Sequence, residues 1–336
     1  MRALITGGAG FIGSHLSDYL LAQGNEVTII DDLSTGSISN LVLARENKRF
    51  DYHIDSIFNK PLLAELIDNA DVVFHLAAAV GVRNIVESPV RTIETNVGGS
   101  ELILKLAAKK QKRVLIASTS EVYGKANKFP FSEDDDLVLG PSTKGRWSYA
   151  CSKLIDEFLA IAYYRERKLP VSIVRLFNTV GARQTGRYGM VLPSFVNQAI
   201  GDQPLTIFGS GDQSRCFGHV SDVVDGLVRC ISSDSTVGQV FNLGNTEEVT
   251  INALAYKVIE STGSRSTLKY LTYDEAYGSG FEDMQRRVPD IAKAYQSFGY
   301  RPTKSLDYIV EDVVAYCRKT MKSSTLNQVA AAAFAD

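Results

Sequence analysis

The chain has 336 residues, a length that suits one large domain with an attached lobe. Its formal net charge of -2 excludes a general attraction to nucleic acid or to an anionic membrane, so any phosphate binding must be local. No apolar stretch approaches the ~20 residues that span a bilayer, and the start of the chain has the pattern of a buried strand rather than a signal peptide. The four cysteines form no C-x-x-C pair, which favours a reduced, cytoplasmic protein over a disulfide framework or zinc knuckle.

The first half of the chain alternates apolar strands with helices. Residues 11–22 have helical spacing of apolar side chains, and apolar strands are predicted at 3–6, 27–30, 72–76 and 114–117. Such strands, buried on both faces and joined by helices, favour a doubly wound parallel sheet in an α/β protein. We assign residues 1–177 to this domain.

The second half has shorter elements and loops rich in Gly, Ser, Gln and Arg. We interpret residues 178–322 mainly as a smaller lobe that supplies a second ligand site. The segment at 239–243 is compatible with a return to the main sheet, so a clean boundary is not expected. The tail at 323–336 is rich in Ser and Ala and is predicted to be loosely ordered or partly helical.

A glycine-rich turn follows the first strand. Gly7, Gly10 and Gly13 stand between that strand and the next helix, where glycine allows a tight turn and a close approach to a pyrophosphate. The second strand ends at Asp31, whose carboxylate is placed to accept hydrogen bonds from ribose hydroxyls and to repel a 2′-phosphate. This pattern predicts a dinucleotide site that prefers NAD to NADP.

A Tyr-x-x-x-Lys pair lies on a helix predicted at 148–164. The spacing places Tyr149 and Lys153 on one helix face, where the lysine ammonium is expected to lower the pKa of the phenol. Thr119 follows the apolar strand at 114–117, and the carboxyl ends of such strands carry active sites. Together these residues predict a phenolate base beside a nicotinamide, with Thr119 bonded to a substrate hydroxyl.

With these motifs the chain resembles the extended short-chain dehydrogenase/reductase family of NAD-dependent sugar epimerases and dehydratases, from Gly7 to about Pro302. The resemblance implies a Rossmann domain with a smaller C-terminal α/β substrate-binding lobe. Further matching segments are His75-Leu76-Ala77-Ala78, Asn96, Ser118-Thr119-Ser120 and Arg175-Leu176-Phe177-Asn178.

The resemblance also implies the site residues. The catalytic residues would be Thr119, Ser120, Glu121, Tyr149 and Lys153. The residues that contact NAD would be Gly7, Gly10, Phe11, Ile12, Gly13, Asp31, Asp32, Asp55, Ile57, Leu76, Ala77, Ala78, Asn96, Tyr149 and Lys153. The residues that contact a nucleotide sugar would be Thr119, Asn178, Val191, Leu192, Thr206, Phe208, Arg215 and Arg287. Arg215 would clamp the diphosphate, although an exposed basic loop is the alternative reading.

Two residues bear on the reaction. Glu121 could assist proton transfer at sugar C5, and Arg287 lies in a segment that looks like the one in UDP-glucuronate decarboxylases, where an arginine reaches the sugar carboxylate. A structural acceptor and a diphosphate or ribose ligand are their respective alternatives. Decarboxylation of UDP-glucuronate to UDP-xylose or its 4-keto precursor is the leading hypothesis. A 4-epimerase acting on UDP-glucuronate or UDP-glucose, a 4,6-dehydratase and a non-catalytic NAD-binding protein stay open.

The sequence also bears on metal binding and on dimerisation. The four histidines are scattered without metal-ligand spacing, so no catalytic metal is predicted. Family relatives dimerise through helices that correspond to 97–109 and 148–164, and the resemblance therefore implies a homodimer.

Overall fold

The computed structural model describes residues 1–81, 85, 87–186, 189–277 and 282–333. Within these residues the main sheet has seven parallel strands in the order β11-β6-β5-β4-β1-β2-β3. Their bounds are β1 (Arg2–Thr6), β2 (Glu26–Asp31), β3 (Phe50–Ile54), β4 (Val72–His75), β5 (Arg113–Thr119), β6 (Val171–Leu176) and β11 (Val240–Leu243). The predicted doubly wound α/β class is confirmed.

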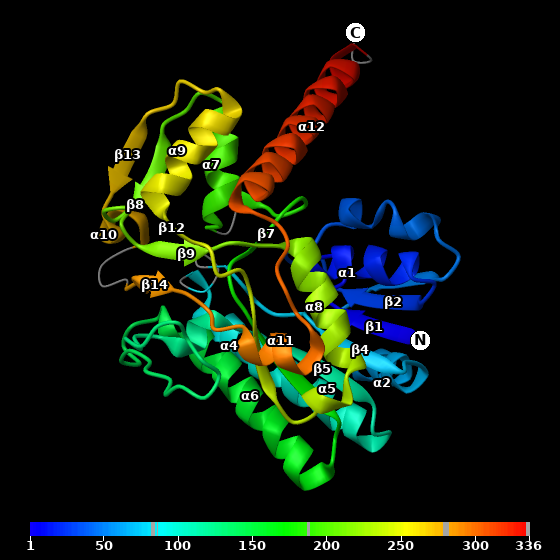
Figure 1. Ribbon diagram of the computed structural model, residues 1–336. Coiled ribbons are helices and arrows are strands. Elements are labelled where there is room, and N and C mark those ends of the chain that lie inside the picture. The colour runs from blue at the N-terminus through cyan, green and yellow to red at the C-terminus, as the bar shows by residue number, and fades with distance from the viewer. Residues whose placement is uncertain (82–84, 86, 187–188, 278–281, 334–336) are drawn as a thin grey trace.

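Helices cover both faces of this sheet (Figure 1). One face packs against α1 (Phe11–Ala22), α8 (Val220–Ser232) and α11 (Ala292–Phe298). The other face packs against α2 (Lys60–Asn69), α5 (Gly99–Lys109) and α6 (Trp147–Arg167). The strands are apolar on both sides because each side meets a helical layer. Ahead of α5 the chain forms the short α4 (Pro89–Ile93) and a π-helical turn, η3 (Glu94–Gly98).

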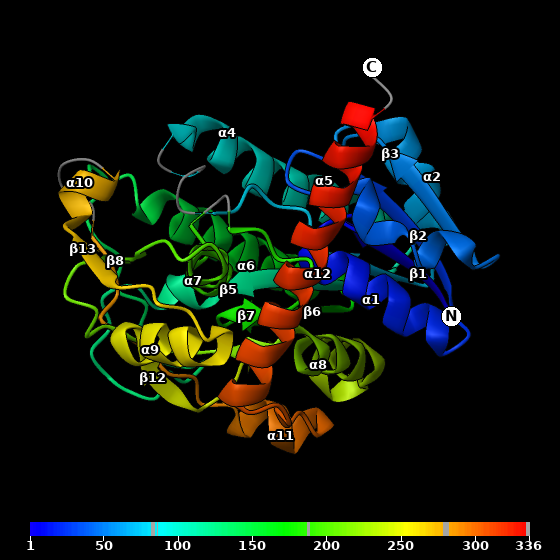
Figure 2. The same cartoon turned by 90° about the horizontal axis from the view of Figure 1, so that it is seen from above.

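The smaller lobe lies beside the carboxyl ends of the strands (Figure 2). Its core is formed by α7 (Val191–Ile200), α9 (Ile251–Thr262) and the first half of α12 (Leu306–Ala333). The parallel pair β8 (Leu205–Phe208) and β13 (Leu268–Leu271) flanks these helices and leads to α10 (Tyr273–Tyr277). A second sheet has the order β12 (Glu248–Thr250), β9 (Ser214–Cys216) and β14 (Arg286–Arg287).

The chain crosses between the lobes more than once. β7 (Thr179–Val180) pairs with β10 (Gly218–His219) just before α8 returns the chain to the main sheet. β11 then pairs in parallel with β6, and α11 packs on it. Short 3-10 turns complete the connections, among them η4 (Ser120–Tyr123) directly after β5. At the end of the chain α12 continues as helix to Ala333, which takes in most of the tail at 323–336.

Candidate active site

A cavity of about 1330 Å³ lies between the lobes at the carboxyl ends of β1, β4, β5 and β6. This edge is where ligands bind in open parallel sheets. The cavity runs from the glycine turn, past the residues after β5 and the start of α6, to β8 and β14 of the smaller lobe.

The glycine turn is tight. Gly7 has φ +73° and its N–H donates to the carbonyl of Ile30 at 2.9 Å. A Cβ at Gly13 would lie 2.2 Å from the carbonyl oxygen of Gly7, so a larger residue there would displace the turn. Free N–H groups at the start of α1 then face the cavity, as a pyrophosphate requires.

Asp31 closes the same end of the cavity. Its carboxylate accepts hydrogen bonds from the N–H of Ala9 at 2.9 Å and of Leu33 at 2.8 Å. Burial raises the pKa of Asp31, and these N–H bonds oppose the rise. The residues therefore fit NAD: a glycine cradle for the diphosphate and an acidic strand end for the ribose.

Most of the residues predicted for the cofactor line this cavity: Gly7, Gly10, Phe11, Ile12, Gly13, Asp31, Asp32, Ile57, Leu76, Ala77, Ala78, Tyr149 and Lys153. Asp55 and Asn96 are not among the residues that line the cavity. Asp55 instead accepts from the side chain of Asn59 and the N–H of Ser56, both at 2.7 Å. Asn96 accepts from the N–H of Ala79 at 2.8 Å and donates to Ser152 at 3.1 Å, so it ties the loop after β4 to α6.

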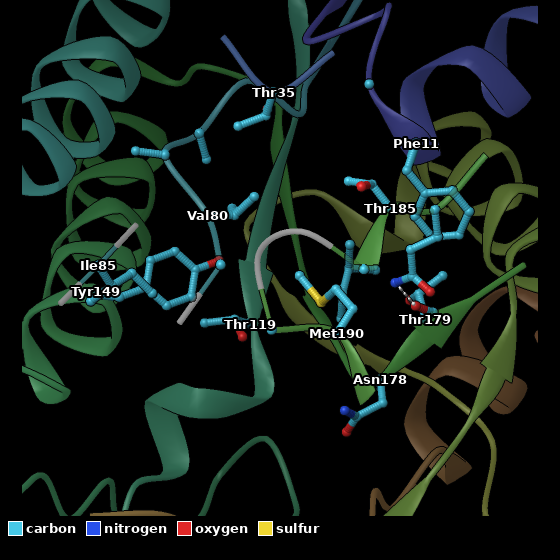
Figure 3. Close-up of a pocket in the computed structure, with 18 of the residues that line it drawn as sticks. Phe11, Thr35, Val80, Ile85, Thr119, Tyr149, Asn178, Thr179, Thr185 and Met190 are labelled. Carbon is cyan, nitrogen blue, oxygen red and sulfur yellow. Dashed lines mark hydrogen bonds between the residues drawn. The ribbon is translucent and has the colours of Figure 1, made fainter. Parts of the chain in front are cut away.

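The predicted proton-transfer residues meet at the centre of the cavity. Figure 3 shows Tyr149 extending from α6 toward Thr119 and Val80, while Met190 and Asn178 approach from the other side. Thr119 hydrogen-bonds to Tyr149, and Lys153 lies one helical turn further along. Ser120 is buried and is not among the residues that line the cavity.

The ionisation of Tyr149 depends on its burial and on its charged neighbours. Burial raises the pKa of Tyr149, and the carboxylates of Glu121 and Asp156 raise it further, against the lowering effects of Thr119 and Arg146. Lys153 is not among the main causes of this shift, and its predicted lowering of the pKa beside a nicotinamide stays a prediction. Lys153 donates to Asp156 at 2.6 Å, and this carboxylate offsets the lysine charge that should favour a phenolate.

A buried group of charges lies beside Tyr149. Arg146 forms an ion pair with Glu121, whose second oxygen is 3.4 Å from Arg287. Asp283 is 2.8 Å from Arg215, 3.4 Å from Arg287 and 3.9 Å from Arg146. We call these five residues the charge cluster. Three guanidiniums against two carboxylates leave one net positive charge, which favours an anionic ligand.

The ionisation of the charge cluster follows from its geometry. Burial raises the pKa of Glu121, but Arg146 and Arg287 together hold it below its ordinary value, so Glu121 is a carboxylate. Burial and the neighbouring Arg287 lower the pKa of Arg215 to about 10. Because these guanidinium groups lie close together, an anionic ligand would stabilise their charges.

The far end of the cavity is lined by four of the residues predicted to contact the nucleotide sugar. Val191 and Leu192 begin α7, and Thr206 and Phe208 lie on β8. Gln198 of α7 donates to Thr206 Oγ1 and accepts from its N–H, each at 3.1 Å, which fixes β8 against α7. A mixed polar and apolar wall of this kind suits a planar base.

Sequence reasoning left three charged residues out of the predicted site. Arg146 directly precedes α6 and lies three positions before Tyr149, a spacing that could have placed it beside Tyr149. Asp156 follows Lys153 at the same spacing. Asp283 has its partners on β9, on β14 and just before α6, so no single local pattern shows that these side chains meet.

A glycine-cradled dinucleotide site joined to a Thr, Tyr and Lys constellation defines the chain as a short-chain dehydrogenase/reductase. Residues 4–313 match the family described as GDP-mannose 4,6 dehydratase, and the chain belongs to that family. Its members include decarboxylases, epimerases and dehydratases that use NAD. The resemblance inferred from sequence is therefore confirmed.

Three individual proteins show which enzymes the chain is similar to. The chain is 38% identical to UDP-N-acetyl-alpha-D-glucosaminuronate decarboxylase of Bacillus cytotoxicus over 95% of this chain and 98% of that protein. It is 35% identical to UDP-glucuronic acid decarboxylase 1 of Danio rerio over 97% of this chain and 75% of that protein. The structure of UDP-glucuronic acid 4-epimerase from Bacillus cereus, in complex with UDP-glucuronic acid and NAD, matches with a TM-score of 0.86 at 30% identity, covering 95% of this chain and all of that one.

Among the residues that the structure describes, no helix is long and apolar enough to cross a membrane. No group of three or more metal-binding side chains gathers among them.

Proposed function

We propose that this chain is an NAD-dependent decarboxylase of a UDP-activated uronic acid, with UDP-glucuronate as the leading substrate. The observation that carries the proposal is the position of Arg287: buried, facing the cavity, and held by Glu121 and Asp283 next to Tyr149. A guanidinium in that place suits a C6 carboxylate on a sugar whose C4 lies at Tyr149. The names of the decarboxylase relatives support the same choice.

The first step is proton removal from the sugar. Tyr149, as the phenolate, takes the proton of the 4-hydroxyl, and Thr119, which hydrogen-bonds to Tyr149, would orient that hydroxyl. NAD held at the glycine turn would supply the redox chemistry, as the acceptor of the C4 hydride. Lys153 and Asp31 would hold the cofactor riboses. The product of this step is a 4-ketone.

The second step follows from the chemistry of that ketone. With a carboxylate on C5 it is a β-keto acid, so the C5–C6 bond breaks, carbon dioxide leaves, and the electron pair delocalises into the ketone as an enolate. A proton must then reach C5. Glu121 is ionised beside Arg146 and Arg287, so it serves first to orient Arg287 and can relay a proton only after taking one up.

One incubation separates the candidate reactions. The purified protein is given UDP-glucuronate, or UDP-N-acetylglucosaminuronate in a parallel sample, and the products are followed by mass spectrometry and NMR. A product lighter by one carbon dioxide supports the proposal. An unchanged mass with a new sugar signal would mean 4-epimerisation, which the likeness to the Bacillus cereus epimerase favours as second candidate. A product lighter by one water, or NAD binding without turnover, would also overturn it.

We further propose that the protein is a cytoplasmic homodimer. α4 and α6 pack together, and four apolar side chains on them are exposed: Val90 at 67%, Ile93 at 43%, Ile155 at 43% and Phe158 at 69%. Water contact over such a face is unfavourable, and a second copy would remove it. Light scattering should give a dimer for the wild type and a monomer for Phe158→Glu. Tyr256→Glu, at an equally exposed aromatic on α9, should leave the mass unchanged.

A further inference from the structure

Lys153 has a buried carboxylate as its partner. Its ammonium donates to Asp156 at 2.6 Å, and the two residues are three positions apart on α6. Asp156 is fully buried and Lys153 is 2% exposed. Burying a carboxylate is unfavourable unless it is paired and hydrogen-bonded, so this carboxylate is expected to have a role beyond stability.

Asp156 also belongs to a chain of buried hydrogen bonds. It bonds to Ser100 of α5, whose Oγ is 3.3 Å from His75 Nε2, and His75 Nδ1 is 2.8 Å from Thr6 Oγ1. Burial lowers the pKa of His75 to about 3, so the ring is neutral. Thr6 Oγ1 in turn accepts from the N–H of Ala77, 3.2 Å away on the loop that lines the cofactor end of the cavity.

One arrangement of protons fits the first part of this chain. Thr6 accepts from Ala77 and so donates to His75 Nδ1, and the Nε2–H of His75 donates to Ser100. Asp156 Oδ2 receives the hydrogen bond from Lys153, and Ser100 also favours the ionised form of this carboxylate. Asp156 Oδ1 is buried without a hydrogen-bond partner among the described residues, so Lys153 is the main group that holds Asp156.

We propose that Asp156 is a positioning residue: it holds Lys153 and offsets its charge, so that Tyr149 can both take the substrate proton and give it back. The inference rests on the proposed function, in which the cycle ends with the hydride and the proton returned to C4 and O4. Tyr149 is then a base in the first half of the cycle and an acid in the second. An unopposed lysine would favour the phenolate and so favour only the first half.

Among the described residues, the other charged groups near this pair have partners of their own. On α6 itself, Glu157 is paired with Arg175 of β6 at 2.8 Å, and Arg146 is paired with Glu121 of η4. From β4, His75 contributes a neutral ring. Asp156 and Glu121 both raise the pKa of Tyr149, but only Asp156 does so while bonded to Lys153.

Asp156→Asn tests the proposal, because it removes the charge and keeps the shape. The pH midpoint for reduction of bound cofactor by substrate should fall by about one unit or more. The tyrosinate absorbance that is lost on Tyr149→Phe should titrate at correspondingly lower pH in the Asp156→Asn background. A larger share of the product should leave as the 4-keto sugar, since return of the proton is slower.

Two further variants keep the test decisive. Asp156→Glu should restore the wild-type midpoint, while Ser100→Ala should loosen the pair without moving the midpoint, because it changes no charge. The proposal is overturned if Asp156→Asn folds and binds NAD but keeps the wild-type midpoint, or if Ser100→Ala moves it equally. Should Asp156→Asn fail to fold, Asp156→Ser, which also removes the charge, is measured in its place, and the same fall of the midpoint is expected. If no nucleotide sugar reduces the cofactor bound to the wild type, the proposed function itself is contradicted.

Discussion

The two walls of the cavity differ in their net charge. On the wall formed by β5 and α6, Lys153 is matched one to one by Asp156, and the proton-transfer group Tyr149 is kept neutral by burial. On the wall formed by β9 and β14, Arg215 and Arg287 share Asp283, which leaves one net positive charge, while Arg146 and Glu121 of the first wall pair with each other. On the first wall the positive and negative charges are equal, which suits reversible proton transfer. On the second wall one positive charge has no negative partner, and a substrate carboxylate or diphosphate can neutralise it.

The largest effect is expected on the balanced wall. Tyr149→Phe removes the hydroxyl that takes the O4 proton and keeps the ring, so we expect a loss of about 10²–10⁴-fold in the rate of cofactor reduction by substrate. NAD affinity, measured by calorimetry, should change little. If the variant keeps near-normal turnover, Tyr149 is not the proton acceptor, and the difference between the walls loses its functional meaning.

The second expected effect is on the positive wall. Arg287→Met should reduce kcat/KM for a carboxylated sugar nucleotide by about 10²-fold, or roughly 3 kcal/mol, because a charge-assisted hydrogen bond is lost. Arg286→Met is the matched control, since Arg286 is adjacent on β14 but points away and pairs with Glu248. Equal losses for both variants would contradict the role of Arg287, as would an equal loss of NAD binding.

The two walls also differ in how far sequence could predict them. Gly7 to Gly13, Tyr149 and Lys153 are local patterns, because a strand-turn-helix and a four-residue helical spacing fix their geometry within a few residues. Arg215 and Arg287 become neighbours only through the parallel pairing of β9 with β14. The resemblance to a family could nominate both arginines, but no periodicity relates segments about 70 positions apart.

The ionisation states lay beyond sequence reasoning for a similar reason. The sequence predicts that Lys153 lowers the pKa of Tyr149, since the two share a helix face. The opposite direction results from burial and from the position of Glu121 and Asp156, which depends on how η4 and α6 pack. A pattern in the chain identifies the groups, and only their packing decides their charge.

A third prediction concerns the buried hydrogen bonds behind the balanced wall. The pKa of His75 is lowered to about 3, so below pH ~6.5 the unfolded chain binds a proton that the folded one does not. Stability from this group is complete above pH ~6.5 and falls as the pH drops toward 3, by at most about 1.4 kcal/mol per pH unit.

Urea unfolding at pH 7, 6 and 5 measures this slope. His75→Asn should be less stable at pH 7 by about 1–3 kcal/mol, because the partners at Thr6 and Ser100 lose their bonds, and its slope with pH should be shallower. An unchanged slope would mean that other groups cause the acid sensitivity.

The smallest effect is expected outside the cavity, at the ion pair of Arg286 and Glu248. The hydrogen bond from Arg286 lowers the pKa of Glu248 to about 2, and its contribution to stability is therefore present above pH ~4.5 and lost as the pH falls toward 2. The two side chains are 48% and 30% exposed, so solvent screens them and Glu248→Gln should cost no more than ~1 kcal/mol at pH 7. A larger loss in urea unfolding, or any loss of turnover, would show that β14 transmits strain from its outer arginine to Arg287. The positive wall would then depend on the whole strand rather than on the side chains that face the cavity.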